Sequence, residues 1–540
     1  MSSLSVQTSG AARDAVDRHV PALVGDRFAS QLFAQDPTLW GPAAEDESSK
    51  RLGWVEAAQV SRPLLGEITA LREEFAAEGV DRFVLAGMGG SSLAPEVITR
   101  TAGVDLFVLD STDPEMVGAA LADRLERTAI VVSSKSGSTV ETDSARRVFA
   151  RAFEDAGIDA ASRIVVVTDP GSPMEASARE AGYRRVFTAD PAVGGRFSAL
   201  TAFGLVPSGL AGVDVEALLD EADEAAEVLR EDAEDNPGLH LGAALGGTDP
   251  LRNKLVFRDL GSGIAGFADW AEQLIAESTG KEGKGLLPVV AGNGPDDAPE
   301  TSAGAADVLV VELVAEDVEE APEGDAVRVS GSLGSQLMLW EVATAVAGRL
   351  LGINPYDQPD VESAKNATRA LLEDKPQPSP ADVVDGPVEI RGSKELLDGT
   401  RTVEDALGKL LGQLPETGYL SVQAYFDRLT WAELESIRPV LARATGRPVT
   451  FGWGPRFLHS TGQYHKGGPA EGVYLQVTAA SETDLDIPDS PFSFGELIAA
   501  QADGDAQVLE DHGRPVLRLR LTDRSQGVAR LREAVAALGR

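Results

Sequence analysis

The chain contains no cysteine, which excludes disulfide bridges, thiol nucleophiles and cysteine-ligated metal ions. Histidine is also scarce, with five residues in a chain of 540. Two of the five, His459 and His465, fall in one glycine-bearing segment, and this density marks the segment as a candidate site. Neither a third nearby histidine nor a cysteine accompanies the pair, so the sequence gives no support for metal ligation.

Long hydrophobic runs are absent as well. The longest uncharged stretch, residues 197–213, is rich in small residues, includes Pro207 and is shorter than the roughly 20 apolar residues that a bilayer requires. We therefore expect no membrane span. Residues 1–13 lack the basic start and apolar core of a secretory signal, so we expect a cytoplasmic protein.

Basic residues are few compared with acidic residues. The 48 lysines and arginines face 86 aspartates and glutamates, which gives a formal net charge of −38. Such a protein repels the phosphates of nucleic acids, so we expect no nucleic-acid partner. An anionic ligand would need a local cationic site.

The pattern of apolar segments predicts an α/β protein. With 43% hydrophobic residues the chain can bury a large core, which at roughly 150 residues each divides into about three or four domains. From Trp54 strand-like and helix-like segments alternate, which is typical of a doubly wound parallel sheet. The expected elements are helix Glu56–Glu78, strand Arg82–Ala86, helix Ala94–Thr101, strand Leu106–Leu109, helix Glu115–Leu125, strand Ala129–Val132, helix Glu141–Ala156 and strand Arg163–Thr168.

Two further α/β units follow. The second has expected strands at Lys254–Phe257, Leu286–Val290 and Val308–Leu313, and Gly261, Gly263 and Gly266 after its first strand weakly resemble a phosphate-binding loop. The third follows a proline-rich linker, with strands Leu420–Ala424, Pro448–Phe451, Val473–Val477 and Val516–Leu521 alternating with helices Thr430–Thr445, Phe494–Gln501 and Gln526–Leu538. The predicted divisions are an N-terminal helical extension that wraps the first domain (1–50), a first domain (51–212), a second domain (213–373), a linker (374–386) and a C-terminal domain (387–540).

Two glycine- and hydroxyl-rich segments, each directly after an apolar run, are candidate phosphate-binding loops. They are Gly87–Ser92 and Ser133–Thr139. Glycines allow the backbone to approach a ligand closely, and hydroxyls with free amides at a helix start supply donors for an anion. One such loop is often a plain strand-to-helix turn. Two loops about one βαβ unit apart can converge on one ligand at adjacent strand ends, so we expect a phosphorylated substrate.

Other polar residues could carry chemistry, although each has an ordinary structural interpretation. Arg196 follows two glycines and could hold an oxyanion, but a solvated surface arginine is the more common case. Gln273 and Glu277 lie four apart on one expected helix face, where Glu277 is a candidate general base among 86 acidic residues. Lys365 lies on a helix after a proline-punctuated loop.

The histidine-bearing segment 457–468 is the last candidate. An imidazole titrates near neutrality and can pass a proton to a sugar ring oxygen. A structural histidine pair, hydrogen-bonded to backbone, is an equally good interpretation of the residues alone.

Taken in this order, the segments resemble the phosphoglucose isomerase family, which interconverts glucose 6-phosphate and fructose 6-phosphate. The resemblance extends over residues 87–365, and five motifs in sequence make it specific. The matching motifs are Gly87–Ser92 for the first loop, Ser133–Thr142 for the phosphate loop, Gly194–Ser198 for the arginine motif, Glu277–Lys281 for the glutamate motif and Lys365, with Asp357, Gln358 and Glu362 before it, for the lysine helix.

The resemblance implies a fold, a reaction and residue roles. The fold would be two doubly wound domains of the sugar-isomerase (SIS) type plus a C-terminal α/β domain. Glu277 would move a proton between C2 and C1 through a cis-enediolate, and Arg196 would stabilise its negative charge. The resemblance implies that no cofactor is needed, and it implies that the protein forms a homodimer. The implied substrate-binding residues are Gly90, Ser91, Ser134, Lys135, Ser136, Ser138, Thr139, Thr142 and Gln273.

One departure concerns the histidine that opens the sugar ring. The common family pattern has a histidine motif between the glutamate and lysine motifs, whereas residues 282–364 contain no histidine. The later position resembles the isomerase part of bifunctional transaldolase/phosphoglucose isomerase proteins, without room for the transaldolase barrel. We favour His465, with Lys365 as a possible second group, because His465 follows Gly462-Gln463 as the family's histidine follows its own Gly-Gln. His459 is the alternative.

Three other functions stay open. A dual phosphoglucose/phosphomannose isomerase would share the same motifs. A non-catalytic phosphosugar-sensing protein would keep both loops but has no use for Glu277 or Arg196. A dinucleotide-dependent dehydrogenase is a weaker option, since Gly87–Ser92 lacks the Gly-x-Gly-x-x-Gly spacing.

Overall fold

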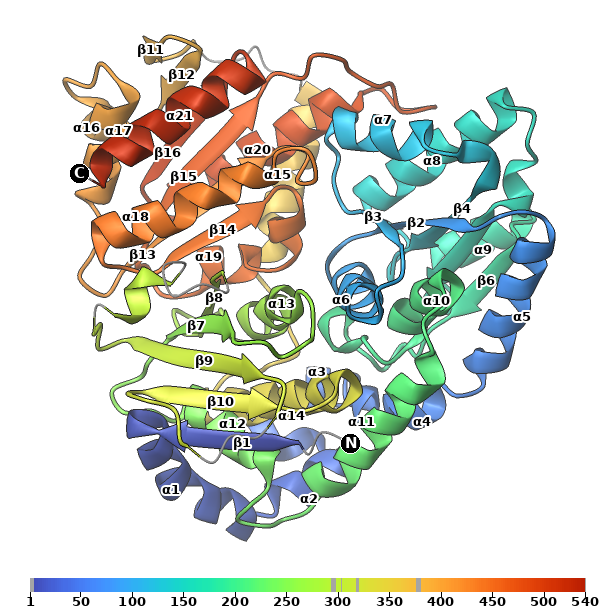
Figure 1. Cartoon of the computed structure of the whole chain (residues 1–540), viewed down its shortest axis with the longest axis vertical. Coiled ribbons are helices and arrows are strands. Elements are labelled where there is room, and N and C mark those ends of the chain that lie inside the picture. The colour runs from blue at the N-terminus through green and yellow to red at the C-terminus, as the bar shows by residue number, and fades with distance from the viewer. Residues whose placement is uncertain (1–3, 293–297, 303, 317–319, 375–379, 540) are drawn as a thin grey trace.

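Three β-sheets, each flanked by helices, organise the protein (Figure 1). The computed structural model describes residues 4–292, 298–302, 304–316, 320–374 and 380–539. The first sheet is wholly parallel in the order β3-β2-β4-β5-β6, as the alternating pattern predicts. Its strands are β2 (Arg82–Gly87), β3 (Phe107–Leu109), β4 (Thr128–Ser133), β5 (Ile164–Thr168) and β6 (Arg185–Thr188).

The second sheet has the order β1-β10-β9-β7-β8, with only β1 antiparallel to its neighbour. The sequence predicts an N-terminal helical extension that wraps the first domain. Helices do form in this region, but a strand precedes them and pairs with β10 at the edge of the second sheet, and the first of the helices packs on α12. The strands are β1 (Ser5–Ser9), β7 (Lys254–Asp259), β8 (Leu287–Val290), β9 (Val308–Val314) and β10 (Ala326–Ser330).

The third sheet is mixed, in the order β11-β12-β16-β15-β13-β14. Its predicted strands β13 to β16 are parallel, and the hairpin β11–β12 adds an antiparallel edge that sequence reasoning missed. The strands are β11 (Val383–Asp385), β12 (Val388–Arg391), β13 (Tyr419–Tyr425), β14 (Val449–Trp453), β15 (Gly472–Ala479) and β16 (Val516–Leu521).

The helices cover the faces of these sheets. In the first half of the chain they are α1 (Gly10–Gly25), α2 (Phe28–Phe33), α3 (Glu45–Ser48), α4 (Ala57–Val60), α5 (Leu64–Ala77), α6 (Leu93–Ala102), α7 (Pro114–Ala122), α8 (Val140–Asp155), α9 (Pro173–Glu180), α10 (Ala202–Ala211), α11 (Val215–Leu229), α12 (Pro237–Gly246) and α13 (Phe267–Thr279). The remaining helices are α14 (Leu333–Leu351), α15 (Val361–Asp374), α16 (Lys394–Leu397), α17 (Val403–Leu411), α18 (Ile437–Thr445), α19 (Gly462–Gly467), α20 (Phe494–Asp511) and α21 (Arg524–Leu538).

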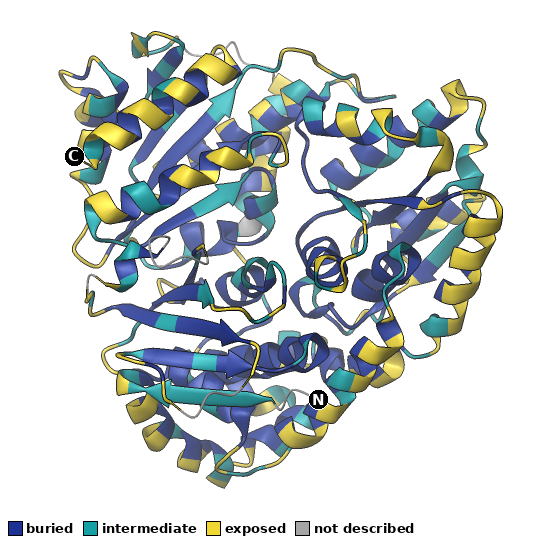
Figure 2. Cartoon of the chain, viewed as in Figure 1, coloured by how far each residue is buried: buried dark blue, intermediate teal, exposed yellow. Residues whose placement is uncertain are grey.

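Burial follows the expected layering. Strands β2, β4 and β5 are buried along their whole length, in keeping with their continuously apolar sequences. In Figure 2 exposed residues gather on the outward faces of α5, α18 and α21, while the central strands of the sheets are mostly dark. The acidic residues of the chain therefore have solvated helix faces available, which lets a strongly negative protein keep an apolar interior.

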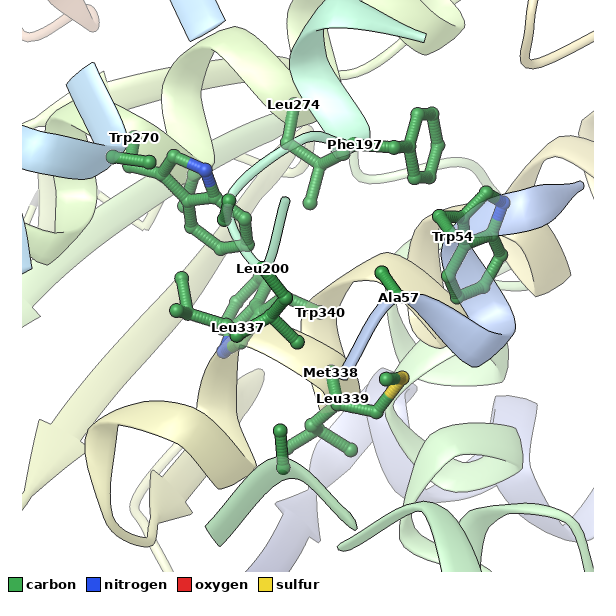
Figure 3. Packing of buried hydrophobic residues seen from close by; sticks show 14 of the residues in the cluster. Trp54, Ala57, Phe197, Leu200, Trp270, Leu274, Leu337, Met338, Leu339 and Trp340 are labelled. Atoms are coloured by element: carbon green, nitrogen blue, oxygen red, sulfur yellow. The ribbon is translucent and has the colours of Figure 1, made fainter. Parts of the chain in front are cut away.

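Helix α14 runs through the centre of the second domain. Every residue from Leu333 to Gly348 is buried, because other helices pack on several sides of it. Figure 3 shows Leu337 and Trp340 of this helix among Trp270 and Leu274 of α13. Helix α13 is thereby held rigidly, which matters because it also carries two candidate site residues.

Helix α15 connects the second and third domains. It packs along α20 of the third domain, and Lys365 lies on this helix with an exposed side chain. Part of the predicted linker, residues 375–379, lies outside the described residues. The domain boundaries themselves stay predictions. No helix in the described ranges is long and apolar enough to cross a membrane.

The packing of α14 yields a stability prediction. Leu337→Ala removes a fully buried side chain and should lower the free energy of unfolding by about 2–5 kcal/mol. The control is Val228→Ala, at a side chain 51% exposed, which should change it by less than about 0.5 kcal/mol. Urea unfolding followed by circular dichroism measures both, and equal effects would contradict the packing described here.

Candidate active site

The two glycine- and hydroxyl-rich loops leave the first sheet side by side. Strands β2 and β4 are parallel neighbours, and their last residues, Gly87 and Ser133, are register partners. The first loop turns through a short 3-10 helix, η3 (Gly89–Ser91). The second leads into the N-terminus of α8. Both loops therefore open at the same carboxyl edge, where parallel sheets bind ligands.

Hydroxyl groups line the second loop. Ser134 Oγ lies 3.0 Å from Thr139 Oγ1 and accepts a hydrogen bond from the amide of Gly137 at 3.2 Å. Ser136 and Ser138 pair their hydroxyls at 2.8 Å. These bonds fold the loop on itself before α8, whose N-terminal amides favour an anion.

Two residues of this loop behave differently from their neighbours. Thr142 is buried, and its hydroxyl has no hydrogen-bond partner among the described residues. Lys135 places its ammonium 2.5 Å from Asp169, in a half-buried ion pair. Lys135 is thus held by a carboxylate, and its charge is partly neutralised before any ligand arrives.

The first loop packs tightly against the arginine segment. A Cβ at Gly90 would lie 1.9 Å from the carbonyl oxygen of Gly195, so no side chain fits there. Gly89 adopts a φ of +55°, and a Cβ there would lie 2.7 Å from Gln273 Nε2. Ser91 is buried in the same turn. The glycines therefore serve close approach of backbone to backbone.

Arg196 is buried, not on the surface, and is held at a fixed position. It lies in the 3-10 helix η6 (Gly195–Phe197), with 4% of its surface exposed. Its guanidinium donates to the hydroxyl of Ser278 at 2.8 Å and the side chain of Gln358 at 3.0 Å. It also donates to the carbonyls of Pro355 at 2.7 Å and Asp357 at 2.9 Å. Burial lowers the pKa of Arg196, and the facing carboxylate of Glu277 opposes that shift.

Glu277 faces this arginine. Its Oε1 lies 3.4 Å from Arg196 Nη1, and its Oε2 accepts a hydrogen bond from Gln273 Nε2 at 3.0 Å. Gln273 and Glu277 share one face of α13, as their spacing predicts. Gln273 Oε1 is buried with no partner among the described residues. The site thus brings together the amide oxygen of Gln273, which can accept a hydrogen bond, the carboxylate of Glu277 and the guanidinium of Arg196.

The third domain reaches this cluster through His459, which ends the 3-10 helix η9 (Arg456–His459). Gln273 Nε2 donates to the carbonyl of His459 at 2.9 Å. The imidazole Nε2 lies 3.1 Å from Glu141 Oε1, which also accepts from Gln501 at 2.7 Å. Burial alone would raise the pKa of Glu141, but the charge and hydrogen bond of the facing imidazole, a backbone hydrogen bond and the charge of Lys365 together lower it.

Glu141 was not singled out by the sequence, although it lies in the first turn of α8 directly after the hydroxyl loop. Lys365 approaches the same carboxylate. The lysine side chain is exposed on α15, and its charge contributes to lowering the pKa of Glu141. The structure therefore groups His459, Glu141 and Lys365 beside the loops.

His465, which the sequence favoured, lies elsewhere. Its ring is 2% exposed, with Nδ1 2.9 Å from the hydroxyl of Tyr419 and Nε2 3.3 Å from that of Ser421. Burial, together with the charges of Lys466 and Arg514, lowers the pKa of His465 well below its ordinary value. Both ring nitrogens are thus engaged inside the third domain, and the geometry favours His459.

Lys281 is a further residue that supports the site. Its ammonium donates to the carbonyls of Asn354 and Asp357 and pairs with the Asp357 carboxylate at 2.6 Å. Burial lowers the pKa of Lys281 to about 8. Because Arg196 also donates to the backbone of this loop, Lys281 fixes one wall that holds the arginine.

Glu272 anchors the segment next to His459 by accepting a hydrogen bond from the hydroxyl of Ser460 at 3.2 Å. Burial raises the pKa of Glu272 from 4.5 to about 8, and the charge of Asp269 adds to the rise. The folded protein therefore holds a proton on this carboxyl that the unfolded chain releases between these two pH values.

This proton gives a pH prediction. Since the folded state binds more protons than the unfolded state between about pH 4.5 and 8, Glu272 makes stability fall as the pH rises through that window. Glu272→Gln, which mimics the protonated carboxyl, should remove that part of the loss. Unfolding midpoints of the wild type and the variant at pH 5, 6, 7 and 8 measure it; parallel curves would contradict the assignment.

Among the described residues, no three histidine, aspartate or glutamate side chains gather closely enough to hold a metal ion. The cluster brings together a carboxylate, a guanidinium, an imidazole–carboxylate pair and a hydroxyl-lined loop.

The chain is similar to proteins of known name. A probable glucose-6-phosphate isomerase of Haloarcula marismortui is 33% identical over 344 residues, which cover 54% of this chain and 77% of that protein. A glucose-6-phosphate isomerase of Rubrobacter xylanophilus is also 33% identical, over 373 residues that cover 56% of this chain and 84% of the relative. No family model matches the chain.

Solved structures share the fold. The hypothetical protein TT0462 of Thermus thermophilus superposes with a TM-score of 0.57 at 28% identity, over 68% of this chain and all of that one. A glucose-6-phosphate isomerase of Chlamydia trachomatis gives a TM-score of 0.55 at 22% identity, over 67% of this chain and 87% of that one, and shows the fold alone. With relatives of 33% identity aligned over most of their length, the chain belongs to the glucose-6-phosphate isomerase family.

Proposed function

We propose that the cluster around Glu277 and Arg196 isomerises glucose 6-phosphate and fructose 6-phosphate by proton transfer within the bound sugar. The enzyme is an aldose–ketose isomerase, as family membership indicates. The observation that carries the residue assignment is the pairing of the Glu277 carboxylate with the buried Arg196 at 3.4 Å, beside two loops suited to a phosphate.

The phosphate of the substrate binds at the hydroxyl loop and the start of α8. The hydroxyls of Ser134, Ser136, Ser138 and Thr139 and the helix amides donate to its oxygens, and the unpartnered hydroxyl of Thr142 is a further donor. Ser91 and the amide at Gly90 border the same edge. Lys135 contributes little net charge because Asp169 neutralises it.

His459 opens the sugar ring. The carboxylate of Glu141 holds its Nε2, so the imidazole is oriented and can carry a positive charge next to a carboxylate. It donates a proton to the ring oxygen as the C1–O5 bond of the aldose breaks. The neutral imidazole that results takes the proton of the C1 hydroxyl as the carbonyl forms, which restores the charged ring. Lys365 adds positive charge nearby.

Glu277 then moves the proton between carbons. Its carboxylate takes the proton from C2 of the open aldose, and the electron pair of that C–H bond forms the C1–C2 double bond of a cis-enediolate. The negative charge passes to oxygen, where the fixed guanidinium of Arg196 stabilises it without reorganisation. Return of the proton from Glu277 to C1, together with transfer of the proton of the C2 hydroxyl to the oxygen on C1, gives the ketose. The amide oxygen Oε1 of Gln273, which has no partner among the described residues, accepts a hydrogen bond from a hydroxyl group of the substrate.

A non-catalytic phosphosugar sensor has no use for such a base and oxyanion partner, so the buried Arg196–Glu277 pair favours the enzyme. Acceptance of mannose 6-phosphate as well, a homodimeric state and a cytoplasmic location stay proposals that rest on the family resemblance.

The role of Glu277 gives the first activity prediction. Glu277→Gln should lower kcat by about 10²–10⁴-fold, because a general base contributes that much, while fructose 6-phosphate still binds. Glu282→Gln, at an exposed glutamate five residues on, is the control and should keep full activity. Coupled assays and calorimetry measure turnover and binding; an unchanged kcat would remove Glu277 from the mechanism.

The two histidines give the second activity prediction. His459→Gln should lower kcat at least about 100-fold with little change in thermal stability. His465→Gln should lower the thermal midpoint, because it disturbs a buried hydrogen-bonded ring, and leave kcat of the folded enzyme near the wild-type value. The reverse pattern would assign ring opening to His465.

A further inference from the structure

A cavity of about 710 Å³ lies outside the candidate active site, between all three domains. It is bounded by the loop after β7 with the start of α13, by α6, and by third-domain residues including Trp453 and Arg456. Neither Glu277, Arg196 nor the hydroxyl loop lines it. The two sites nonetheless share α13 and η9, since Arg456 begins the 3-10 helix that ends at His459.

The cavity occupies the edge of the second sheet where ligands bind in open α/β folds. Asp259, Ala291 and Leu313, at or just beyond the carboxyl ends of β7, β8 and β9, line it. Strand β7 lies between the other two, so connections run to opposite sides at this point. Such a topological switch point is a preferred ligand position.

The loop there has the spacing of a dinucleotide fingerprint, with Gly261, Gly263 and Gly266 between a strand and a helix. Its hydrogen bonds argue against a phosphate. Asp259 Oδ1 already accepts from the amides of Gly261 at 3.0 Å and Ser262 at 2.7 Å. A carboxylate thus occupies two of the amides that a pyrophosphate would use.

The charges of the lining are balanced. Four arginines (Arg100, Arg428, Arg438 and Arg456) meet four carboxylates (Glu96, Asp259, Asp269 and Glu435). Glu96 alone pairs with Arg428 at 2.9 Å and with Arg456 at 2.6 Å. With most of the guanidinium charge neutralised within the wall, the cavity favours an uncharged ligand over an anion.

One wall is aromatic and fixed. Phe451 and Trp453 meet edge to face with ring centroids 5.0 Å apart, and the indole N–H of Trp453 donates to Glu435 at 2.6 Å. The negative face of an aromatic ring attracts the slightly positive C–H face of a sugar. Asp269, half-buried in the lining, accepts no side-chain hydrogen bond from any described residue, so its oxygens are available to hydroxyl donors.

We propose that this cavity is a second ligand site, which binds an uncharged sugar of mono- or disaccharide size. The sugar packs a C–H face on Trp453 and donates hydroxyls to Asp269, while the remaining N–H groups of Arg456 donate to its oxygens. The volume accommodates such a ligand with room for bridging waters. The inference does not depend on the isomerase mechanism, because binding is measured without turnover.

The test is calorimetric titration of the full chain with glucose and with maltose. At least one should bind at one site per chain, and Trp453→Ala and Asp269→Asn should each weaken it about tenfold, which corresponds to 1.4 kcal/mol. Trp453→Phe keeps an aromatic wall and should stay close to wild type. Glu433→Gln, outside the cavity and two residues from Glu435, is the charge control.

Three outcomes would overturn the proposal. No heat with either sugar would exclude a sugar site. Binding of adenosine monophosphate without binding of either sugar would make the loop a nucleotide site despite Asp259. Sugar binding that survives Trp453→Ala and is displaced by fructose 6-phosphate would place the sugar in the isomerase site instead.

Discussion

The contact between Arg196 and Glu277 is the constraint on which the rest of the site depends. A buried guanidinium is costly unless every side of it is satisfied. Here a hydroxyl, an amide, two backbone carbonyls and a carboxylate surround it. Those partners come from α13 and from the loop before α15, whereas Arg196 itself lies in the first domain. The contacts of this one arginine therefore fix the position of the first domain relative to the second. The same arrangement leaves the carboxylate and the guanidinium facing one ligand position, which is what proton transfer through an enediolate requires.

The third domain is tied to this pair through one side chain. Gln273 donates from the same nitrogen to Glu277 and to the carbonyl of His459, so the position of η9 follows that of α13. Glu141 then orients the imidazole from the first domain. Residues from all three α/β units thus converge, and none of the three units contains the site alone. The cavity beside η9 lies at the same three-way junction, which explains why a ligand there would touch elements that the reaction uses.

Much of the fold could be predicted from sequence because apolar strands covered on both faces, such as those of the first sheet, carry a strong local signal. Strand β1 could not, since Ser5–Ser9 is short and polar and its partner lies more than 300 residues away. The sequence predicts that the glycines of η3 bring the backbone close to a ligand, and it gives no sign that Gly90 packs against the backbone of Gly195. For Arg196 the sequence favours a position on the surface, because the partners that bury it lie at least 82 residues away along the chain. His459 and His465 lie only six residues apart, and their different surroundings depend on distant partners, Glu141 for His459 and Tyr419 with Ser421 for His465.

The most direct measurement is a crystal structure of the protein with fructose 6-phosphate bound. The account predicts the phosphate at the 134–142 loop and a Glu277 carboxylate oxygen within about 3.5 Å of C1 and C2. It also predicts Arg196 beside the substrate's oxygens and His459 nearest the ring oxygen. A phosphate bound elsewhere, or a Glu277 carboxylate turned away from the sugar carbons, would contradict it.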